Sequence, residues 1–321
     1  MPASTASLPA LPAHASTIAY LGPEATFTEA ALLSEPDLAG LERISLATIL
    51  DVINATEAGT VDLGFVPIEN AIEGSVTATI DKLAFESNLL IQREVVIDVH
   101  LNLLGVKGAS LEEVQEVASY QVATAQCRRF LSESTPNANI ANANSTAEAA
   151  RIVAEAGDPT RAAIGTALAA EVYGLEVLAP NIEDHTGNQT RFVLIATEGV
   201  PLPTGHDKTT VVVFQRADAP GSLLSILQEF AARSINLSKL ESRPTKTALG
   251  DYCFIIDLDG HINDEVVADC LRNLKSKHSD VRFLGSYPAA SSNGAEIREA
   301  TNLAWEQAGE WIQSLRARIQ A

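Results

Sequence analysis

The fold is decided by residues Gly64–Thr77, which read Gly-Phe-Val-Pro-Ile-Glu-Asn-Ala-Ile-Glu-Gly-Ser-Val-Thr. The apolar start predicts a buried strand that breaks at Pro67, and Glu69 and Asn70 follow at its carboxyl end. Ser75 is then predicted to cap the next helix. Polar groups between a strand end and a helix N-terminus form an anion site in α/β sheets. A tight strand-to-helix turn with a cap is the alternative interpretation.

The segments around this stretch predict a sheet with helices on its faces. Strands are predicted at Thr17–Leu21 and Val61–Ile68, and two helices lie between them. Ser45 is predicted to cap the second of these helices. The glycine-rich fingerprints of dinucleotide and P-loop sites occur nowhere in the sequence, which argues against a nicotinamide-dependent enzyme.

A second α/β segment follows and returns to the first. An alternating apolar pattern over 93–106 predicts strand, and Thr190–Ala196 carries apolar residues on both faces, as an interior strand does. One late strand after a complete α/β unit indicates a two-lobed fold with its binding site in the cleft between the lobes. The elements predicted between these strands are helix 111–117, strand 118–122, helix 124–131, extended 138–144, helix 146–156, strand 161–165, helix 167–173 and strand 175–178.

The predicted pattern of strands and helices changes after a Gly- and Pro-rich linker at Glu198–Asp207. The predicted order is then βαββαβ, the ferredoxin-like arrangement, which usually pairs with a copy of itself. A pattern of apolar residues from Ala304 to Ile319 predicts an amphipathic C-terminal helix. The six elements are strand 209–215, helix 221–233, strand 236–243, strand 252–258, helix 264–277 and strand 281–287.

Composition excludes several classes of protein. The 321 residues carry a net charge of −19, which disfavours nucleic acid and anionic membranes as partners. The three cysteines are an odd number and form no CxxC pair, which argues against a disulfide scaffold or a structural zinc site. The first twenty residues contain no Lys or Arg, and they resemble no signal peptide. We therefore expect a cytoplasmic protein with a disordered leader at residues 1–15.

The motifs taken together resemble prephenate dehydratase with a C-terminal regulatory ACT domain. The resemblance runs from Thr17 to Pro288, nearly the whole chain. It departs from the family at Ala25, where glycine is usual, and at Tyr120, where a histidine is common. The motifs that carry it are Tyr20–Thr28, Val66–Asn70, Gly74–Val76 and Thr190–Phe192 in the catalytic part, and Asp218–Leu224 and Glu241–Lys246 as the two ACT effector motifs.

The resemblance implies an enzyme without cofactor or metal that converts prephenate to phenylpyruvate, water and carbon dioxide. It also implies feedback control by phenylalanine and assembly into a homodimer or homotetramer. The implied fold is α/β, a two-lobed catalytic domain like the periplasmic binding proteins plus a βαββαβ ACT domain. The expected domains are catalytic at 16–198 (lobe one at 16–98 and 188–198, lobe two at 99–187), linker at 199–207, ACT at 208–290 and C-terminal helix at 291–321.

The resemblance also assigns roles to residues of this chain. Thr190 is the catalytic candidate, as a donor to the hydroxyl that leaves, although a β-branched residue starting a strand is common. Glu69 is either a proton source or an ion-pair partner in the cleft, and strand alternation turns Arg191 away from Thr190. The expected substrate-binding residues are Thr26, Thr28, Glu69, Asn70, Gly74, Ser75, Thr77, Arg191 and Phe192. The expected effector-binding residues are Pro220, Gly221, Ser222, Leu223, Leu224, Asn236, Leu237, Glu241, Ser242, Arg243 and Pro244.

Two alternatives to this function remain open at the level of sequence. One is the same chemistry on arogenate, the transaminated substrate. The other is a non-catalytic protein that senses an amino acid with a two-lobed receptor fold and an ACT domain. Assays with both substrates separate the first alternative, and catalysis itself separates the second.

Overall fold

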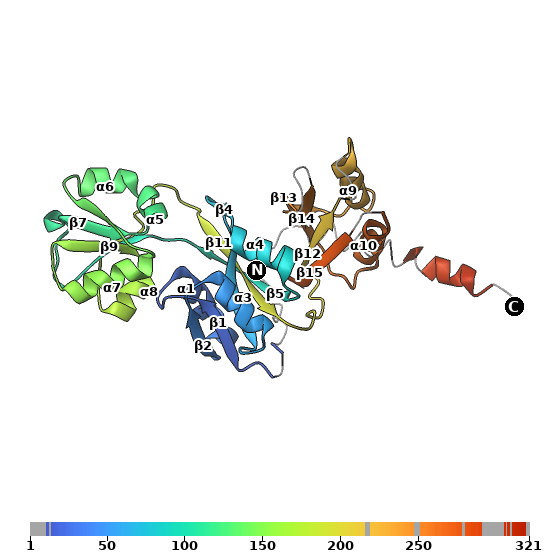
Figure 1. The fold of residues 1–321 in the computed structure, drawn as a ribbon, viewed down its shortest axis with the longest axis horizontal. Helices are drawn as coiled ribbons and strands as arrows, with labels where there is room; N and C mark the ends of the chain where they lie inside the picture. The colour runs from blue at the N-terminus through green and yellow to red at the C-terminus, as the bar shows by residue number, and fades with distance from the viewer. Residues whose placement is uncertain are drawn as a thin grey trace, which may run out of the picture. The chain divides into compact units, whose positions relative to one another are not determined.

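The structure is a computed structural model that describes residues 11–12, 14–215, 219–246, 251–277, 280–290, 305, 307–308 and 310–318. The chain forms two compact units, and each unit is built from segments that are not consecutive in sequence. The N-terminal unit comprises His14–Ile80 and Val95–Val193, and the C-terminal unit comprises Asp81–Glu94 and Leu194–Ala321 together with Met1–Ala13. The short segment Asp81–Glu94 therefore packs with the C-terminal part of the chain (Figure 1).

The first sheet contains the stretch that opened the sequence analysis. Its strand order is β2-β1-β3-β11-β5, and β4 pairs with the end of β3. Strand β1 is parallel to both β2 and β3, as expected of a sheet whose strands are joined through helices. The strands are β1 (Thr17–Leu21), β2 (Glu42–Leu46), β3 (Leu63–Asn70), β4 (Gly74–Ser75), β5 (Leu90–Asp98) and β11 (Gln189–Ala196).

Three expectations for this sheet are wrong. Ser45 lies in strand β2, and the next helix, α3 (Ile49–Glu57), is capped by the hydroxyl of Thr48 instead. Pro67 does not end β3, because an extended strand tolerates proline where its missing N–H is not required. Ser75 caps no helix, since it lies in β4.

The helices beside this sheet are short. Helix α1 (Phe27–Leu33) begins at Thr26, whose hydroxyl accepts the Glu29 N–H, and α2 (Pro36–Ala39) follows it. Helix α4 (Thr77–Asp81) continues into η1 (Lys82–Glu86), a π-helix. Such wide turns are rare within helices and are frequent at functional sites.

The second sheet has the order β10-β6-β9-β7-β8. Helices α7 (Thr146–Ala156) and α8 (Ala167–Tyr173) and strand β9 (Arg161–Gly165) have the predicted bounds. The helix predicted over 111–117 is wrong, because only the 3-10 turn η2 (Leu111–Glu113) forms before the strand β7. The remaining elements are β6 (Asn102–Gly105), β7 (Glu116–Ser119), α5 (Gln121–Ala125), α6 (Arg128–Ser134), β8 (Asn139–Asn142) and β10 (Glu176–Ala179).

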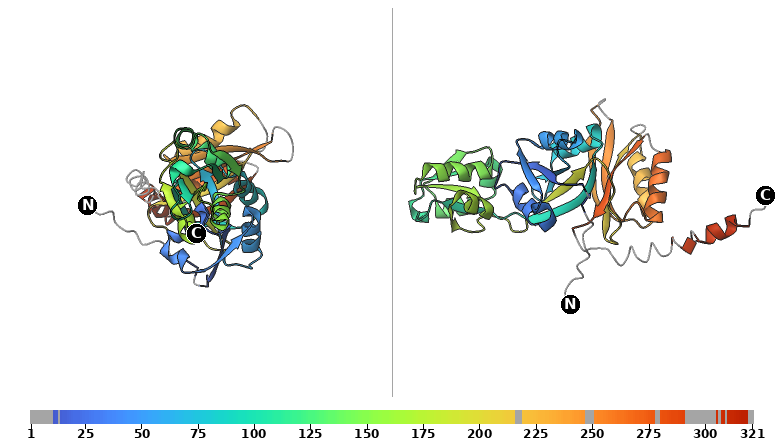
Figure 2. Two further views of the ribbon diagram at one scale, coloured as in Figure 1. Left: turned by 90° about the vertical axis from the view of Figure 1, so that its left-hand side faces the viewer. Right: turned by 90° about the horizontal axis from the view of Figure 1, so that it is seen from below.

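The C-terminal unit contains the predicted βαββαβ order in a sheet β13-β14-β12-β15. Figure 2 shows both of its helices on one face of this sheet. Their buried side chains pack on those of the strands in one apolar cluster, which includes Val211, Phe230 and Leu274. The elements are β12 (Asp207–Phe214), α9 (Ser222–Ala231), β13 (Leu237–Pro244), β14 (Tyr252–Asp259), α10 (Glu265–Lys277) and β15 (Asp280–Pro288).

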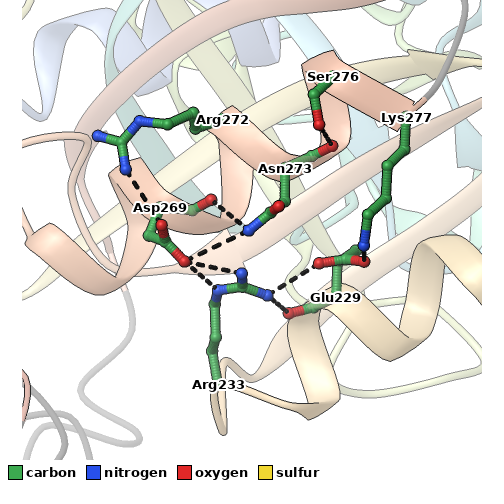
Figure 3. A network of polar contacts seen from close by, with 7 residues as sticks. All are labelled: Glu229, Arg233, Asp269, Arg272, Asn273, Ser276 and Lys277. Atoms are coloured by element: carbon green, nitrogen blue, oxygen red, sulfur yellow. Dashed lines mark hydrogen bonds and ion pairs between the residues drawn. The ribbon is translucent and has the colours of Figure 1, made fainter.

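Arg233 ties the two helices of this unit together (Figure 3). Its guanidinium donates to Asp269 from Nε at 3.0 Å and from Nη2 at 2.7 Å, and it donates to Glu229 at 2.9 Å. Lys277 adds an ion pair to Glu229 from the end of α10. Two guanidinium nitrogens therefore share one oxygen of Asp269 while the third reaches Glu229, and these charge-assisted hydrogen bonds link α9 with α10.

The segment Asp81–Glu94 is joined to the rest of the C-terminal unit by a buried ion pair. Both carboxylate oxygens of Glu94, whose side chain is 1% exposed, accept hydrogen bonds from Lys208 at 2.9 and 2.8 Å. Strand β15 approaches so closely that a Cβ atom on Gly285, where φ is +141°, would clash with the Ile91 carbonyl oxygen. Only glycine fits both that space and that backbone conformation.

Two expectations fall largely outside the described residues. These are the leader at residues 1–15, of which only 11–12 and 14–15 are described, and most of the C-terminal helix. Residues 310–316 of that helix are helical, and Trp311 is 61% exposed. In the described part of the chain, no helix is both long and apolar enough to span a bilayer.

Asp62 makes the start of β1 sensitive to pH. Its carboxylate accepts hydrogen bonds from the backbone amides of Ser16 and Thr17, and these hold its pKa well below the ordinary value of 3.8. A depressed pKa contributes stability that is present at neutral pH and is lost as the pH falls through 4 toward the folded-state pKa. We expect Asp62→Asn to lower the free energy of unfolding at pH 7, and its difference from wild type to shrink below pH 4. Urea unfolding at pH 7, 4 and 3 measures this, with the exposed Glu42→Gln as control. A difference that does not change with pH would contradict it.

Candidate functional site

The side-chain amide of Asn70 joins the two stretches that the sequence singled out. Asn70 lies at the end of β3, and its Nδ2 donates to Thr190 Oγ1 at 2.9 Å and to Asn188 Oδ1 at 2.9 Å. Thr190 and Asn188 lie at and just before the start of β11, which is 118 to 120 residues further along the chain. Both are largely buried, at 9% and 4% exposure. The structure therefore brings Asn70 and Thr190 together, as the motifs predicted.

The orientation of the Asn70 amide is set by its other side. Its Oδ1 accepts the backbone amides of Ile72 at 2.9 Å and Glu73 at 3.0 Å. An oxygen held by two N–H donors cannot exchange places with the amide nitrogen without opposing them. The nitrogen must therefore face Thr190, and Thr190 Oγ1 accepts a hydrogen bond while keeping its own proton to donate.

Two side chains that were not predicted as site residues extend this network. Asn188 Nδ2 donates to Gln126 Oε1 at 3.1 Å, which connects β11 with the α5–α6 turn of the second sheet. Asn188 stands two residues before Thr190, beside a motif that carries the family resemblance, and this closeness in sequence was the available signal. Gln126 lies outside those motifs, and no periodic pattern reveals a polar network.

Arg191 and Phe192 take structural positions. Arg191 pairs with Glu69, Nη1 to Oε2, at 3.4 Å, so the ion-pair interpretation of Glu69 is the one that the structure supports. The side chain of Phe192 is 1% exposed and stacks on Phe65 with ring centroids 5.4 Å apart. We correct its assignment from substrate contact to core, because a ring enclosed in this way has no surface left for a ligand.

The loop after Asn70 differs from the predicted anion site. Gly74 and Ser75 form β4 opposite Asn70 and Glu69, and Gly74 adopts a left-handed φ of +80°. Helix α4 begins two residues later at Thr77, which is exposed, and it spans five residues. The loop therefore places Ser75 beside Glu69 through strand pairing, and an anion site at a helix capped by Ser75 is wrong.

The threonines of the first motif are both engaged or enclosed. Thr26 caps α1 and donates its hydroxyl to the Leu21 carbonyl at 3.3 Å. Thr28 is 4% exposed. Their contribution to substrate binding stays a prediction.

The three cysteines are buried, which rules them out as nucleophiles. Burial raises the pKa of the Cys127 and Cys270 thiols to about 12 and that of Cys253 to about 11. They are protonated at neutral pH, whereas a nucleophilic cysteine must be a thiolate. Within the described residues, no three His, Cys, Asp or Glu side chains form a group able to hold a metal ion.

A hollow of about 640 Å³ lies in the C-terminal unit at the turn from β12 to α9. Gly221 precedes α9 with φ of +85°, a conformation that favours glycine. Ser242 of β13 reaches the same hollow from the second effector motif, and Tyr252 and Phe254 add aromatic surface. The predicted effector residues that line it are Gly221, Ser222, Leu223, Leu224 and Ser242.

The other predicted effector residues do not line this hollow. Glu241 and Arg243 pair with each other at 2.9 Å, and Arg243 also reaches Asp81 at 3.8 Å, as Lys246 does at 2.7 Å. Alternation along β13 separates this pair from Ser242. Pro220, Asn236, Leu237 and Pro244 are not among the residues that line the hollow.

In the comparison with known proteins, two family models match successive parts of the chain. A family model for prephenate dehydratase matches residues 18–200, and one for the ACT domain matches residues 209–276. The chain belongs to the prephenate dehydratase family.

Similar proteins match over nearly their full length. A prephenate dehydratase of Mycolicibacterium vanbaalenii is 42% identical and is matched over 93% of this chain and 98% of its own. A crystal structure of prephenate dehydratase from Arthrobacter aurescens in complex with L-Phe is 41% identical, with a TM-score of 0.85 over 94% of this chain and 99% of its own. A structure described as a novel type of quorum-quenching acylase is 28% identical, with a TM-score of 0.75 over 85% and 98%. The predicted fold class, a two-lobed α/β domain with an ACT domain, is confirmed.

Ala25 explains why glycine is usual at this position of the prephenate dehydratase motif. Its φ is +66°, in the left-handed region, and the residue is fully buried. Its amide donates to the Glu29 carboxylate at 2.6 Å, and its carbonyl accepts the Thr166 hydroxyl at 3.0 Å. These contacts hold alanine in a conformation that costs a residue with a Cβ atom about 1–2 kcal/mol.

We predict that Asn70→Asp destabilises this member of the family by about 1–3 kcal/mol. The change replaces a donor by a second acceptor facing the oxygens of Thr190 and Asn188. Urea unfolding at pH 7 measures the loss, and Asn54→Asp, on the exposed side of α3, is the matched control for the added charge. Equal stability of the two variants would show that the Asn70 amide does not organise this site.

Proposed function

We propose that the chain is a prephenate dehydratase, a lyase that forms phenylpyruvate from prephenate and is inhibited by phenylalanine bound at its ACT domain. The observation that supports the catalytic half is the 2.9 Å hydrogen bond from the Asn70 amide to the Thr190 hydroxyl, which joins two of the family motifs. Family membership supports the substrate class.

The reaction needs a donor rather than a strong base. The bond from the ring to its carboxylate breaks, and its electron pair enters the ring as carbon dioxide departs. The ring carbon–oxygen bond breaks at the same time, and its electron pair leaves with the hydroxyl group, which takes up a proton to become water. Aromaticity drives the reaction, so the barrier lies in expelling a poor leaving group. A positioned donor to that oxygen contributes about 10²–10⁴-fold.

Thr190 is suited to this donor role by the network behind it. Because the Asn70 amide donates into Thr190 Oγ1, the Thr190 proton is directed away from Asn70. Threonine is too weak an acid to deliver its proton outright, so it stabilises the departing oxygen by hydrogen bonding. The substrate carboxylates remain for other donors, because Arg191 is already paired with Glu69.

The hollow beside α9 is the proposed effector site. Backbone amides at the Gly221 turn suit a carboxylate, and Leu224, Tyr252 and Phe254 offer apolar surface for an aromatic side chain. The L-Phe complex of the Arthrobacter aurescens relative supports the choice of effector. We assign the protein to the cytoplasm and expect it to work as a homodimer or homotetramer, with Glu241 to Pro244 of a second copy near each effector site.

The first experiment is phenylpyruvate formation from prephenate by the purified protein without added metal or cofactor. We expect turnover that falls when millimolar phenylalanine is present. Turnover of arogenate but not of prephenate would show that arogenate is the substrate. No turnover of either compound would indicate a non-catalytic sensor.

Thr190 gives the sharpest test of the mechanism. We expect Thr190→Val to lower kcat at least about 10²-fold, because it removes the hydroxyl while keeping the β-branched shape. Thr190→Ser keeps the hydroxyl and should retain most of the activity. Steady-state kinetics on both variants, with circular dichroism as a check of folding, decides the matter. Turnover near wild type in Thr190→Val would end the donor role.

Leu224 tests the effector site. Its side chain is 58% exposed and lines the hollow, so Leu224→Ser should weaken phenylalanine binding roughly tenfold without removing a core contact. Isothermal titration with phenylalanine measures the affinity. Leu202→Ser in the linker, 80% exposed, is the matched control and should bind as wild type does. Equal affinities in all three proteins would move the effector site elsewhere.

A further inference from the structure

We infer that Asn188 is a positioning residue, which passes the direction set at Asn70 along a chain of side-chain hydrogen bonds to Gln126, so that this hydrogen-bond chain presents a donor at each end. This inference rests on the proposed function. The chain runs Thr190–Asn70–Asn188–Gln126, with contacts of 2.9, 2.9 and 3.1 Å. It connects β3, β11 and the α5–α6 turn within the N-terminal unit.

The direction of this chain is fixed at Asn70. Two backbone amides occupy the Asn70 oxygen, so its nitrogen must donate, and it donates to both Thr190 and Asn188. An amide whose oxygen accepts on one side offers its nitrogen on the other. Asn188 therefore donates to Gln126 through Nδ2, and this holds the Gln126 oxygen toward Asn188.

The two ends of this hydrogen-bond chain therefore both present a hydrogen-bond donor. Thr190 Oγ1 accepts from Asn70 and keeps its proton to donate, and Gln126 accepts through Oε1 and turns its NH₂ group outward. Neither the Thr190 proton nor the Gln126 NH₂ group has an acceptor within the described part of the chain. Donors at both ends suit a substrate that carries two carboxylates and a departing hydroxyl group.

Asn188 is the residue that connects Asn70 to Gln126, and no other residue of the network makes this connection. Asn188 is 4% exposed, and its backbone carbonyl accepts the Val99 amide at 2.8 Å, which fixes the backbone just before β11. A carboxylate at this position would face the Gln126 oxygen with a second acceptor. Gln126 would then have to rotate, and its outward end would become an acceptor.

Asn188→Asp and Asn188→Ala separate this role from a structural one. We expect Asn188→Ala to lower kcat on the order of 10²-fold, as misplacement of reacting groups does. Asn188→Asp should be similarly impaired at pH 8 and should recover as the pH falls toward 5.5, because burial at a position that is 4% exposed raises the pKa of a carboxyl group above its ordinary range. A protonated carboxyl group donates to Gln126 and restores the original direction. The ratio of Asn188→Ala to wild type should not change with pH.

The experiment is steady-state kinetics on prephenate between pH 5.5 and 8, with the uncatalysed rate subtracted and folding checked by circular dichroism. Asn54→Asp on α3 controls for added charge and should follow wild type. The double variant Asn188→Ala with Gln126→Ala should have nearly the same kcat as Gln126→Ala alone, because Asn188 acts through Gln126. This non-additive loss is also measurable if Asn188→Asp folds poorly.

Three outcomes would overturn the inference. These are kinetics of Asn188→Ala within about twofold of wild type, an Asn188→Asp profile with no recovery at low pH, or additive losses in the double variant. An inactive wild-type protein would instead overturn the proposed function, and this inference with it. The wild-type assay therefore distinguishes the two failures.

Discussion

The site depends on one amide, that of Asn70. Its oxygen is held by the two amides of the turn that follows, and its nitrogen bonds the start of β11. A buried amide satisfied on both sides is rigid, because any rotation sets like groups against each other. Two strands that are adjacent in the sheet but far apart in the chain are thus held in one register at the point where chemistry is proposed. The ion pair between Glu69 and Arg191 lies one residue before Asn70 on β3 and one residue after Thr190 on β11, and it adds a second contact between the same two strands.

The sequence predicted the elements whose ends are marked by local chemistry. Helix α7 begins after the Ser145 cap and ends at Gly157 in a left-handed conformation, and α8 is bounded in the same way by Thr166 and Gly174. Strand β2 was missed because its alternating exposure leaves no continuous apolar run, and its serine resembled a cap. The helix predicted at 111–117 failed for a related reason, since apolar residues three apart occur in turns as well as in helices.

The candidate site was predictable in part for a physical reason. Motif residues identify the strand ends that carry chemistry, and Asn70 and Thr190 do meet. What the motifs could not give is the partner of each side chain. Phe192 belongs to the core although it stands two residues after Thr190, and Asn188 joins a network that needs segments 62 and 118 residues away. Strand alternation did separate Thr190 from Arg191, because that rule is purely local.

The buried ion pair between Glu94 and Lys208 joins residues on the two sides of the linker in one compact unit. The boundary between the two family domains is therefore visible in the sequence but is not a boundary between compact units. The lysine stands on the first strand of the ACT domain, and the carboxylate stands on a strand whose other end lies in the N-terminal unit. Removing one partner of a buried ion pair is far more costly than removing both. A chain shortened at the linker would expose the surface around Gly285 and Ile91 and would lose the ammonium group that compensates Glu94. The regulatory domain is therefore no detachable module, and its acquisition or loss in a lineage would require compensating changes inside the catalytic sequence.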